Sequence, residues 1–168
     1  MAAFLISTFF YYVEATFFYC DRKWFDKNLE TLYSGCTSSD ELDESFVCFA
    51  LLAFAFGSQF AHLRSTSDSG KENEVFQGDP GKRFYDVAQT LMPRIMSKCS
   101  LIGVQVFLLA GLYNLPSNFP DTAYLYLGMG VRMALASGLH RQMSSPTLDP
   151  HLVEVRNRLW WSVYSIDR

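Results

Sequence analysis

The 168-residue sequence has little charge, few histidines and few cysteines. Charged residues make up 18% of it, there are three histidines, and none of its four cysteines (Cys20, Cys36, Cys48 and Cys99) forms a C-x-x-C pair. Because structural zinc sites usually draw on such closely spaced pairs, we expect no metal site and instead expect reduced, buried thiols. Three histidines also supply little material for an acid–base or nucleophilic centre. We therefore predict no catalytic, cofactor-binding or metal-binding residues, and no enzyme.

Concentrated positive charge and long apolar runs are missing as well. The 14 basic residues are scattered among 17 acidic ones, for a net charge of −3, whereas contact with phosphates needs a dense positive surface. Direct binding of nucleic acid is therefore not expected. The apolar runs 2–13 and 46–56 are shorter than the roughly 18 to 20 residues that cross a bilayer. The first also has no basic residue before Arg22, unlike a secretory signal, so we expect an intracellular protein without a membrane span.

Hydrophobic residues, by contrast, are abundant. They make up 49% of the sequence and aromatic residues 16%, with 15 Phe and 9 Tyr, which argues against disorder. The length fits one domain, and a domain of this size buries roughly 70% of the surface of its unfolded chain. So much Phe with so little charge indicates that apolar surface meets other parts of a longer protein. We therefore predict one partial domain over residues 1–168.

Apolar residues recur at three- and four-residue steps along the chain and predict an all-α fold. We expect an irregular bundle of about seven helices, which is part of a larger helical domain. The expected helices cover residues 3–19, 26–33, 45–63, 82–93, 101–113, 121–137 and 150–168. Two β-strands are the alternative for the first, because Phe, Tyr and Thr favour pleated surfaces. Pro93 is expected either to end the fourth helix or to kink it. Residues 64–82 are expected to form an internal polar linker.

The ends of the last two helices carry clear local signals. Asp121 is expected to be an N-cap, because its carboxylate can accept from the free N–H groups of a first turn. Gly138 can adopt the left-handed conformation after the last helical residue, with Leu139 folding back on the final turn. Asp149 followed by Pro150 predicts the N-cap and first residue of the last helix.

Polar residues and glycines are uncommon inside apolar helices, so their presence needs a structural explanation. Ser100 is expected to cap the helix over 101–113, whose apolar run Gln105 interrupts. Gly128 and Gly130 each cost about 1 kcal/mol relative to alanine in a helix interior. We expect the close approach of a neighbouring helix there, and the alternative is a backbone contact to a small ligand. They are not a phosphate loop, because the preceding strand and the third glycine are missing.

Side chains near the last helix are expected to pair with one another. Arg156 lies four residues before Trp160, so its guanidinium can cover the indole face. Asp167 and Arg168 are expected to be buried or half-buried polar partners that fix the docking of the helix. His140 follows a helix C-terminus, where we expect it to cap or pack rather than to perform chemistry.

One set of residues stands out as a combination: Gln105, Gly138, Leu139, His140, Arg141, Glu154, Arg156, Arg158, Leu159, Trp160, Trp161, Asp167 and Arg168. This set resembles the regulatory domain, or middle homology region, of fungal zinc binuclear cluster transcription factors of the Zn2Cys6 type. The domain is also described as fungal-specific or xylanolytic-activator-type. The combination is far more specific than its parts, since a lone Trp-Trp or Gly-Leu-His occurs by chance in many helical proteins.

The resemblance implies a regulatory domain that controls RNA polymerase II transcription in the nucleus. Its partners would be other parts of a transcription factor or co-regulator proteins, and a small-molecule effector and a homodimer are both compatible with it. In the family a six-cysteine cluster binds zinc and DNA. That cluster is absent from this sequence, so both would come only through a missing domain. The alternative from another class is a helical ligand-binding or lipid-handling protein, or an enzyme, with an aromatic interior.

Overall fold

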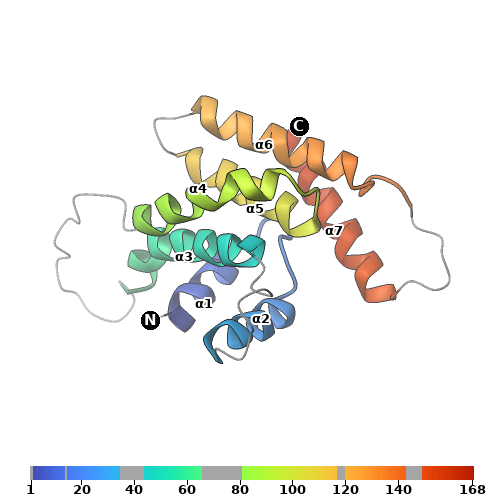
Figure 1. Cartoon of the computed structure of the whole chain (residues 1–168). Coiled ribbons are helices and arrows are strands. Elements are labelled where there is room, and N and C mark those ends of the chain that lie inside the picture. Colours follow the sequence, from blue (N-terminus) through green and yellow to red (C-terminus); the bar gives the residue numbers. More distant parts are fainter. Residues whose placement is uncertain (1, 14, 35–43, 66–80, 117–119, 143–148) are drawn as a thin grey trace.

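The computed structural model describes residues 2–13, 15–34, 44–65, 81–116, 120–142 and 149–168, with side chains omitted for 62–65. These residues form seven helices and no strand, which confirms the all-α prediction (Figure 1). The helices are α1 (Ala2–Tyr12), α2 (Arg22–Ser34), α3 (Glu44–Ser65), α4 (Lys82–Met96), α5 (Leu101–Asn114), α6 (Pro120–Ala136) and α7 (Pro150–Asp167).

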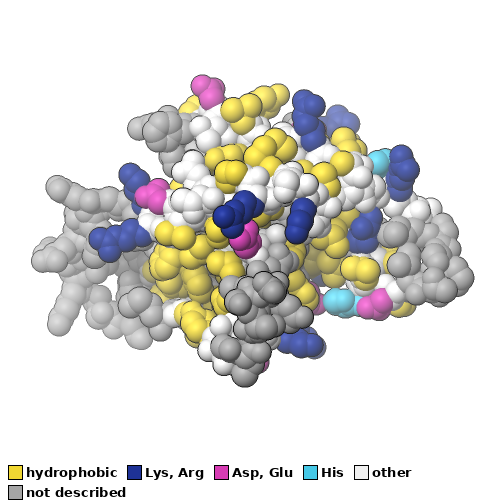
Figure 2. Space-filling view, in the orientation of Figure 1, with side chains coloured by type: hydrophobic (Ala, Val, Ile, Leu, Met, Phe, Trp, Pro, Cys, Tyr) yellow, Lys and Arg dark blue, Asp and Glu magenta, His cyan; other side chains and the backbone are white. Residues whose placement is uncertain are grey.

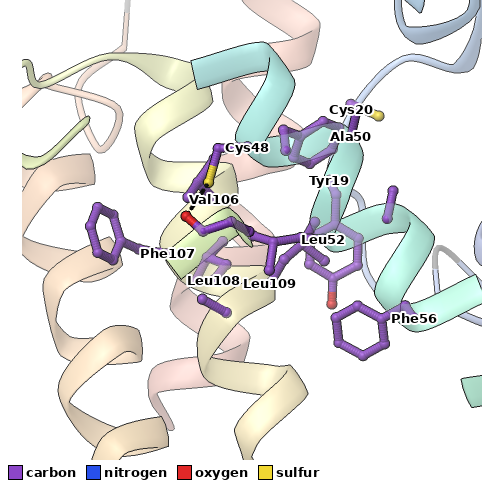
Figure 3. Close-up of a cluster of buried hydrophobic side chains, with 14 of the residues drawn as sticks. Tyr19, Cys20, Cys48, Ala50, Leu52, Phe56, Val106, Phe107, Leu108 and Leu109 are labelled. Atoms are coloured by element: carbon purple, nitrogen blue, oxygen red, sulfur yellow. Dashed lines mark hydrogen bonds between the residues drawn. The ribbon is translucent and has the colours of Figure 1, made fainter. Parts of the chain in front are cut away.

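The core lies around α3 and α5, the two most apolar long stretches. α3 packs between α1 and α4, while α5 packs against α3 on one side and against α6 on the other (Figure 1). α7 contacts both α6 and α5. Leu52 of α3 and Leu108 and Leu109 of α5 are fully buried and meet in one cluster (Figure 3). α5 is apolar nearly all round, as expected of a helix enclosed by neighbours.

α1 ends at Tyr12, earlier than the sequence predicted, and the backbone at Phe18 and Tyr19 bonds to distant helices. The backbone N–H of Phe18 donates to Ser162 Oγ of α7 at 3.0 Å, and the carbonyl of Tyr19 accepts from Gln105 Nε2 of α5. These bonds satisfy backbone groups that a longer helix would have satisfied internally. Residues 18–20 are therefore an irregular segment between helices, and the strands considered as the alternative are not observed in it.

α2 begins at Arg22, earlier than the predicted start at residue 26. The carboxylate of Asp21 accepts from the backbone N–H of Lys23 at 2.7 Å and of Trp24 at 3.2 Å. Asp21 is thus the N-cap, and residues 22–25, which precede the predicted start, form the first turn of the helix.

α3 is longer than the apolar run 46–56 that we counted from the sequence. Its segment Glu44–Ala61 has a mean hydropathy of 1.5 and is long enough to cross a membrane by length and composition. The expectation that no stretch reaches that length was therefore wrong. Somewhat more than half of the segment, 56%, is buried inside the bundle, and buried core helices of soluble proteins share this composition.

The boundaries of the predicted linker and of α4 also differ from expectation. Of residues 64–82, Arg64 and Ser65 belong to α3 and Lys82 opens α4, while residues 66–80 lie outside the described residues. α4 continues through Pro93 to Met96 instead of stopping at the proline. Pro93 lies on the exposed side of the helix.

Two of the described cysteines are buried inside the bundle. Cys48 is fully buried, its thiol donates to the carbonyl of Ala88 at 3.4 Å, and burial raises its pKa to about 12 (Figure 3). Cys20 is also buried, and neither is in a disulfide, as predicted. Cys99 is exposed, so the prediction was wrong for it, and Cys36 lies outside the described residues.

Three helical glycines differ in what surrounds them. A Cβ added to Gly130 of α6 would lie 3.3 Å from the Leu108 side chain of α5, which confirms the predicted close approach. Gly128 has no atom within 4 Å of such a Cβ, so for this glycine the prediction was wrong. The tightest crossing is at Gly57 of α3. A Cβ there would lie 2.8 Å from the carbonyl carbon of Leu5 in α1, and closer still to its oxygen.

Candidate functional site

The turn after α6 is held as the sequence predicted. Gly138 has a φ of +66°, the left-handed region that glycine reaches without a Cβ penalty. Its N–H donates to the carbonyl of Leu135, and the N–H of Leu139 donates to that of Ala134, both at 3.0 Å. This pattern is a Schellman motif, and the side chain of Leu139 is 2% exposed against the last turn.

The start of α7 is also as predicted, whereas that of α6 differs slightly. Asp149 caps α7 by accepting from the His151 N–H at 3.0 Å, with Pro150 as the first helical residue. α6 begins at Pro120, so Asp121 lies inside its first turn and is not the N-cap. Proline suits a first helical position because its fixed φ is helical and its missing N–H would have no partner there.

Arg156 joins α7 to the end of α6. Its Nη2 donates to the carbonyls of Ser137 at 3.2 Å and Gly138 at 3.4 Å. The carbonyls at the end of a helix lack internal partners and carry partial negative charge, so they attract a guanidinium. This contact replaces the predicted stacking of Arg156 on Trp160, which was wrong.

Trp160 instead packs against the residue that follows the turn. The ring centroids of Trp160 and His140 are 5.9 Å apart, and Arg141 Nε donates to His140 Nε2 at 3.4 Å. Neighbouring Leu159 is fully buried. The α6–α7 junction therefore brings together the signature residues Gly138, Leu139, His140, Arg141, Arg156, Leu159 and Trp160.

Arg158 and Ser162 hold the N-terminal segment against α7. The Arg158 guanidinium carbon lies 4.1 Å from the centroid of the Phe18 ring, and Ser162 Oγ accepts from the Phe18 N–H at 3.0 Å. Sequence reasoning missed Phe18 and Ser162, because no local pattern marks partners 144 residues apart. Glu154 is exposed and makes no hydrogen bond or ion pair within the described part of the chain.

The outer face of α7 carries a group that we call the α7 aromatic surface: Trp161, Tyr164 and Arg168. Trp161 is 62% exposed, and its ring meets Tyr164 edge-on at 5.8 Å. The Arg168 guanidinium carbon lies 5.0 Å from the centroid of the Tyr164 ring. Asp167 and Arg168 are both exposed, so their predicted burial was wrong. Charged side chains in the last turn of this helix face solvent rather than the core.

A cavity of about 370 Å³ lies where α2, α5 and α7 begin. Its apolar wall consists of Trp24, Leu101, Ile102, Leu152 and Val155. Residues from three helices and from the irregular segment at Cys20 meet there, so the cavity exists only in the folded chain.

The polar groups of this cavity include one of the signature residues. Gln105 is 4% exposed, and while its Nε2 donates to the Tyr19 carbonyl, its Oε1 is buried without a hydrogen-bond partner. Ser100 caps α5 as predicted, its hydroxyl accepting from the Gly103 N–H at 3.0 Å.

A hydrogen-bonded pair, Asp21 and His151, completes the lining. Asp21 Oδ2 lies 3.0 Å from His151 Nε2, and this hydrogen bond holds the pKa of the Asp21 carboxyl below its ordinary value. The sequence singled out Gln105 as the polar break in an apolar run. It did not pair Asp21 with His151, since each reads locally as a residue of a separate helix start.

The visible face of the molecule carries no stripe of one charge. Lys and Arg side chains are spread over it singly, among hydrophobic and acidic ones (Figure 2). This face therefore offers no concentrated positive surface of the kind that contact with phosphates needs.

Comparison with known proteins identifies the relatives of this fold. Residues 6–168 match the family described as the fungal specific transcription factor domain. An uncharacterized transcriptional regulatory protein of Schizosaccharomyces pombe is 37% identical over 165 residues, which are 98% of this chain and 20% of that protein. The thiamine repressible genes regulatory protein thi1 of the same organism is 32% identical over 165 residues, 98% of this chain and 21% of that protein.

Activator of stress genes 1 of Saccharomyces cerevisiae is 29% identical over 150 residues, which are 87% of this chain and 15% of that protein. No solved structure matches the chain. The chain thus spans about a fifth of the length of the first two relatives. With the match extending over nearly its whole length, the chain belongs to the fungal specific transcription factor domain family and is a regulatory domain of a fungal transcription factor.

Proposed function

We propose that this domain regulates a longer nuclear transcription factor through contacts of the α7 aromatic surface with another part of that factor or with a co-regulator. The family and the relatives support a role in transcription, and the relatives are about five times as long as this chain. Zinc and DNA binding would belong to a separate domain of the longer protein. The domain itself would have no catalytic role.

The observation that carries the proposal is the exposure of Trp161. Its neighbours in the signature, Leu159 and Trp160, pack against the bundle, whereas Trp161 is 62% exposed and contributes little to the core. Tryptophan, tyrosine and arginine are the residues that most often dominate the energy of protein interfaces. Because the side chain of Trp161 contributes little to the core, it is available to contact another protein surface.

A reporter assay tests this proposal. The full 168-residue chain is fused between a heterologous DNA-binding domain and a constitutive activation segment in yeast. We expect the chain to change reporter output relative to the fusion without it, and Trp161→Ala to remove most of that change.

The matched control is Tyr33→Ala, because Tyr33 of α2 is similarly exposed at 67% but lies on another helix. Far-UV circular dichroism of the purified variants confirms that both keep their helices. Equal reporter output from Trp161→Ala and the unaltered chain would refute the proposal, as would an equal loss in Tyr33→Ala.

A further inference from the structure

We infer that the cavity at the start of α2, α5 and α7 is a binding site for a small, neutral, largely apolar molecule that carries an N–H or O–H donor. Binding itself does not depend on transcription. The role of the ligand as an effector rests on the proposed function above.

The size and walls of the cavity fit a small organic molecule. Ligand cavities in proteins commonly measure roughly 300 to 1,000 Å³ and are mostly apolar, and this one measures about 370 Å³. An apolar cavity of about 150 Å³ in another protein takes up benzene. A two-ring compound therefore fits here, with Trp24, Ile102 and Leu152 among its apolar contacts.

The requirement for a donor comes from Gln105. The Tyr19 carbonyl can only accept a hydrogen bond, so it fixes the orientation of the Gln105 amide with Nε2 on its side. Oε1 is left buried without a donor, and leaving such a group unsatisfied costs about 1–3 kcal/mol. Oε1 lies just behind the accessible wall of the cavity, so a ligand N–H or O–H reaches it with a small movement of that wall, and the new bond would recover the cost.

The preference for a neutral ligand follows from the charges in the lining. Asp21 and His151 are the charged or titratable acidic and basic side chains among the described residues that line the cavity. They are 3.0 Å apart and pair with each other. The Asp21 carboxylate also accepts from the backbone N–H groups of Lys23 and Trp24. Since it is already bonded in this way, an ion entering the cavity would lose its hydration without gaining a free counter-charge.

A ligand bound in the cavity would contact α7 and stabilise its position in the bundle. His151, Leu152 and Val155 of α7 line one side of the cavity, and the same helix carries the α7 aromatic surface. A ligand that contacts α2, α5 and α7 together binds only when the three are in place, so it shifts the population toward that arrangement. This gives a physical route from the cavity to the α7 aromatic surface.

The test uses indole and benzofuran, which have nearly the same shape, although only indole has an N–H donor. Each is titrated into the full 168-residue chain labelled with ¹⁵N, and amide shifts are followed by NMR. We expect indole to shift the side-chain amide signal of Gln105 and the backbone signals of Leu101, Ile102 and Leu152. Benzofuran should bind about tenfold more weakly, as expected for about 1.4 kcal/mol of lost hydrogen bonding.

Two tryptophan substitutions locate the binding. Leu152 is 40% exposed at the cavity, so Leu152→Trp should fill it and abolish the shifts without disturbing the core. Leu135 is 44% exposed on α6 and lies outside the lining, so Leu135→Trp should leave indole binding unchanged.

Three results would overturn the inference: no indole-induced shifts at millimolar concentration, shifts that persist in Leu152→Trp, or equal affinity for benzofuran. None of these bears on the reporter assay with Trp161→Ala, which involves no added ligand. Failure of the binding site and failure of the proposed regulatory contact are therefore separable.

Discussion

Replacing Gly57 and Gly128 by alanine should change the stability of the domain in opposite directions. Both glycines lie inside helices, α3 and α6, so alanine gains the same helix propensity at each, about 1 kcal/mol. At Gly128 nothing lies within 4 Å of the added Cβ, so the gain should appear in full. Gly128→Ala is expected to stabilise the domain by about 1 kcal/mol.

At Gly57 the added Cβ would meet backbone rather than side chain. It would lie 2.8 Å from the carbonyl carbon and 3.0 Å from the Cα of Leu5, so α1 as a whole must move away from α3. Overpacking of this kind costs about 1–3 kcal/mol, and occasionally more, and a helix backbone cannot rotate aside as a side chain can. Because the added Cβ meets backbone, we take the upper end of this range, about 3 kcal/mol. The propensity gain of about 1 kcal/mol then leaves a net loss of about 2 kcal/mol for Gly57→Ala.

Urea unfolding followed by circular dichroism measures both changes, provided that the slope of free energy against urea stays the same in the variants. In a thermal melt the two variants should differ by about 6–12 °C, since about 1 kcal/mol corresponds to about 2–4 °C in a domain of this size. A Gly57→Ala variant as stable as the unaltered chain would show that α1 and α3 do not cross at Leu5, and would refute the reasoning.

Two further predictions concern the ends of α7. Arg156→Ala should lower the free energy of unfolding by about 1–2 kcal/mol, because the carbonyls at the end of α6 lose a charged donor. In urea unfolding, Arg132→Ala is the control, since Arg132 is exposed and makes no ion pair or hydrogen bond in the described part of the chain; equal losses would contradict the contact. The hydrogen bond from His151 holds the pKa of Asp21 below its ordinary 3.8, so the ionised carboxylate contributes stability above about pH 4 that is lost as the pH falls through the lowered pKa. His151→Ala should raise that pKa toward 3.8 in a carboxyl NMR titration, and an unchanged value would mean that the pair does not form in solution.

The sequence located the helix ends that depend on neighbouring residues. Ser100, Gly138 and Asp149 act within one turn of their own positions, so residue type and spacing were sufficient to place them. The signature around the α6–α7 junction pointed to the family for the same reason, because it lies in one continuous stretch of chain.

The sequence-based predictions were wrong where a residue bonds to a group outside its own helix instead of following its local preference. Residues 18–20 have the composition of a helix continuation, yet their backbone groups bond to Ser162 and Gln105, which lie 144 and 86 residues away from them in the chain. Arg156 could reach Trp160 within its own helix, but the carbonyls of Ser137 and Gly138 after α6 are stronger acceptors than an indole face.

By itself the sequence determined the all-helical architecture and most of the helix termini, because hydrophobic spacing and capping are local. Only the tertiary structure decided where the irregular segment lies, which signature residues face solvent, and that three helix starts enclose a cavity. Those features depend on groups far apart in the chain, whose meeting is set by how the helices pack rather than by any short pattern.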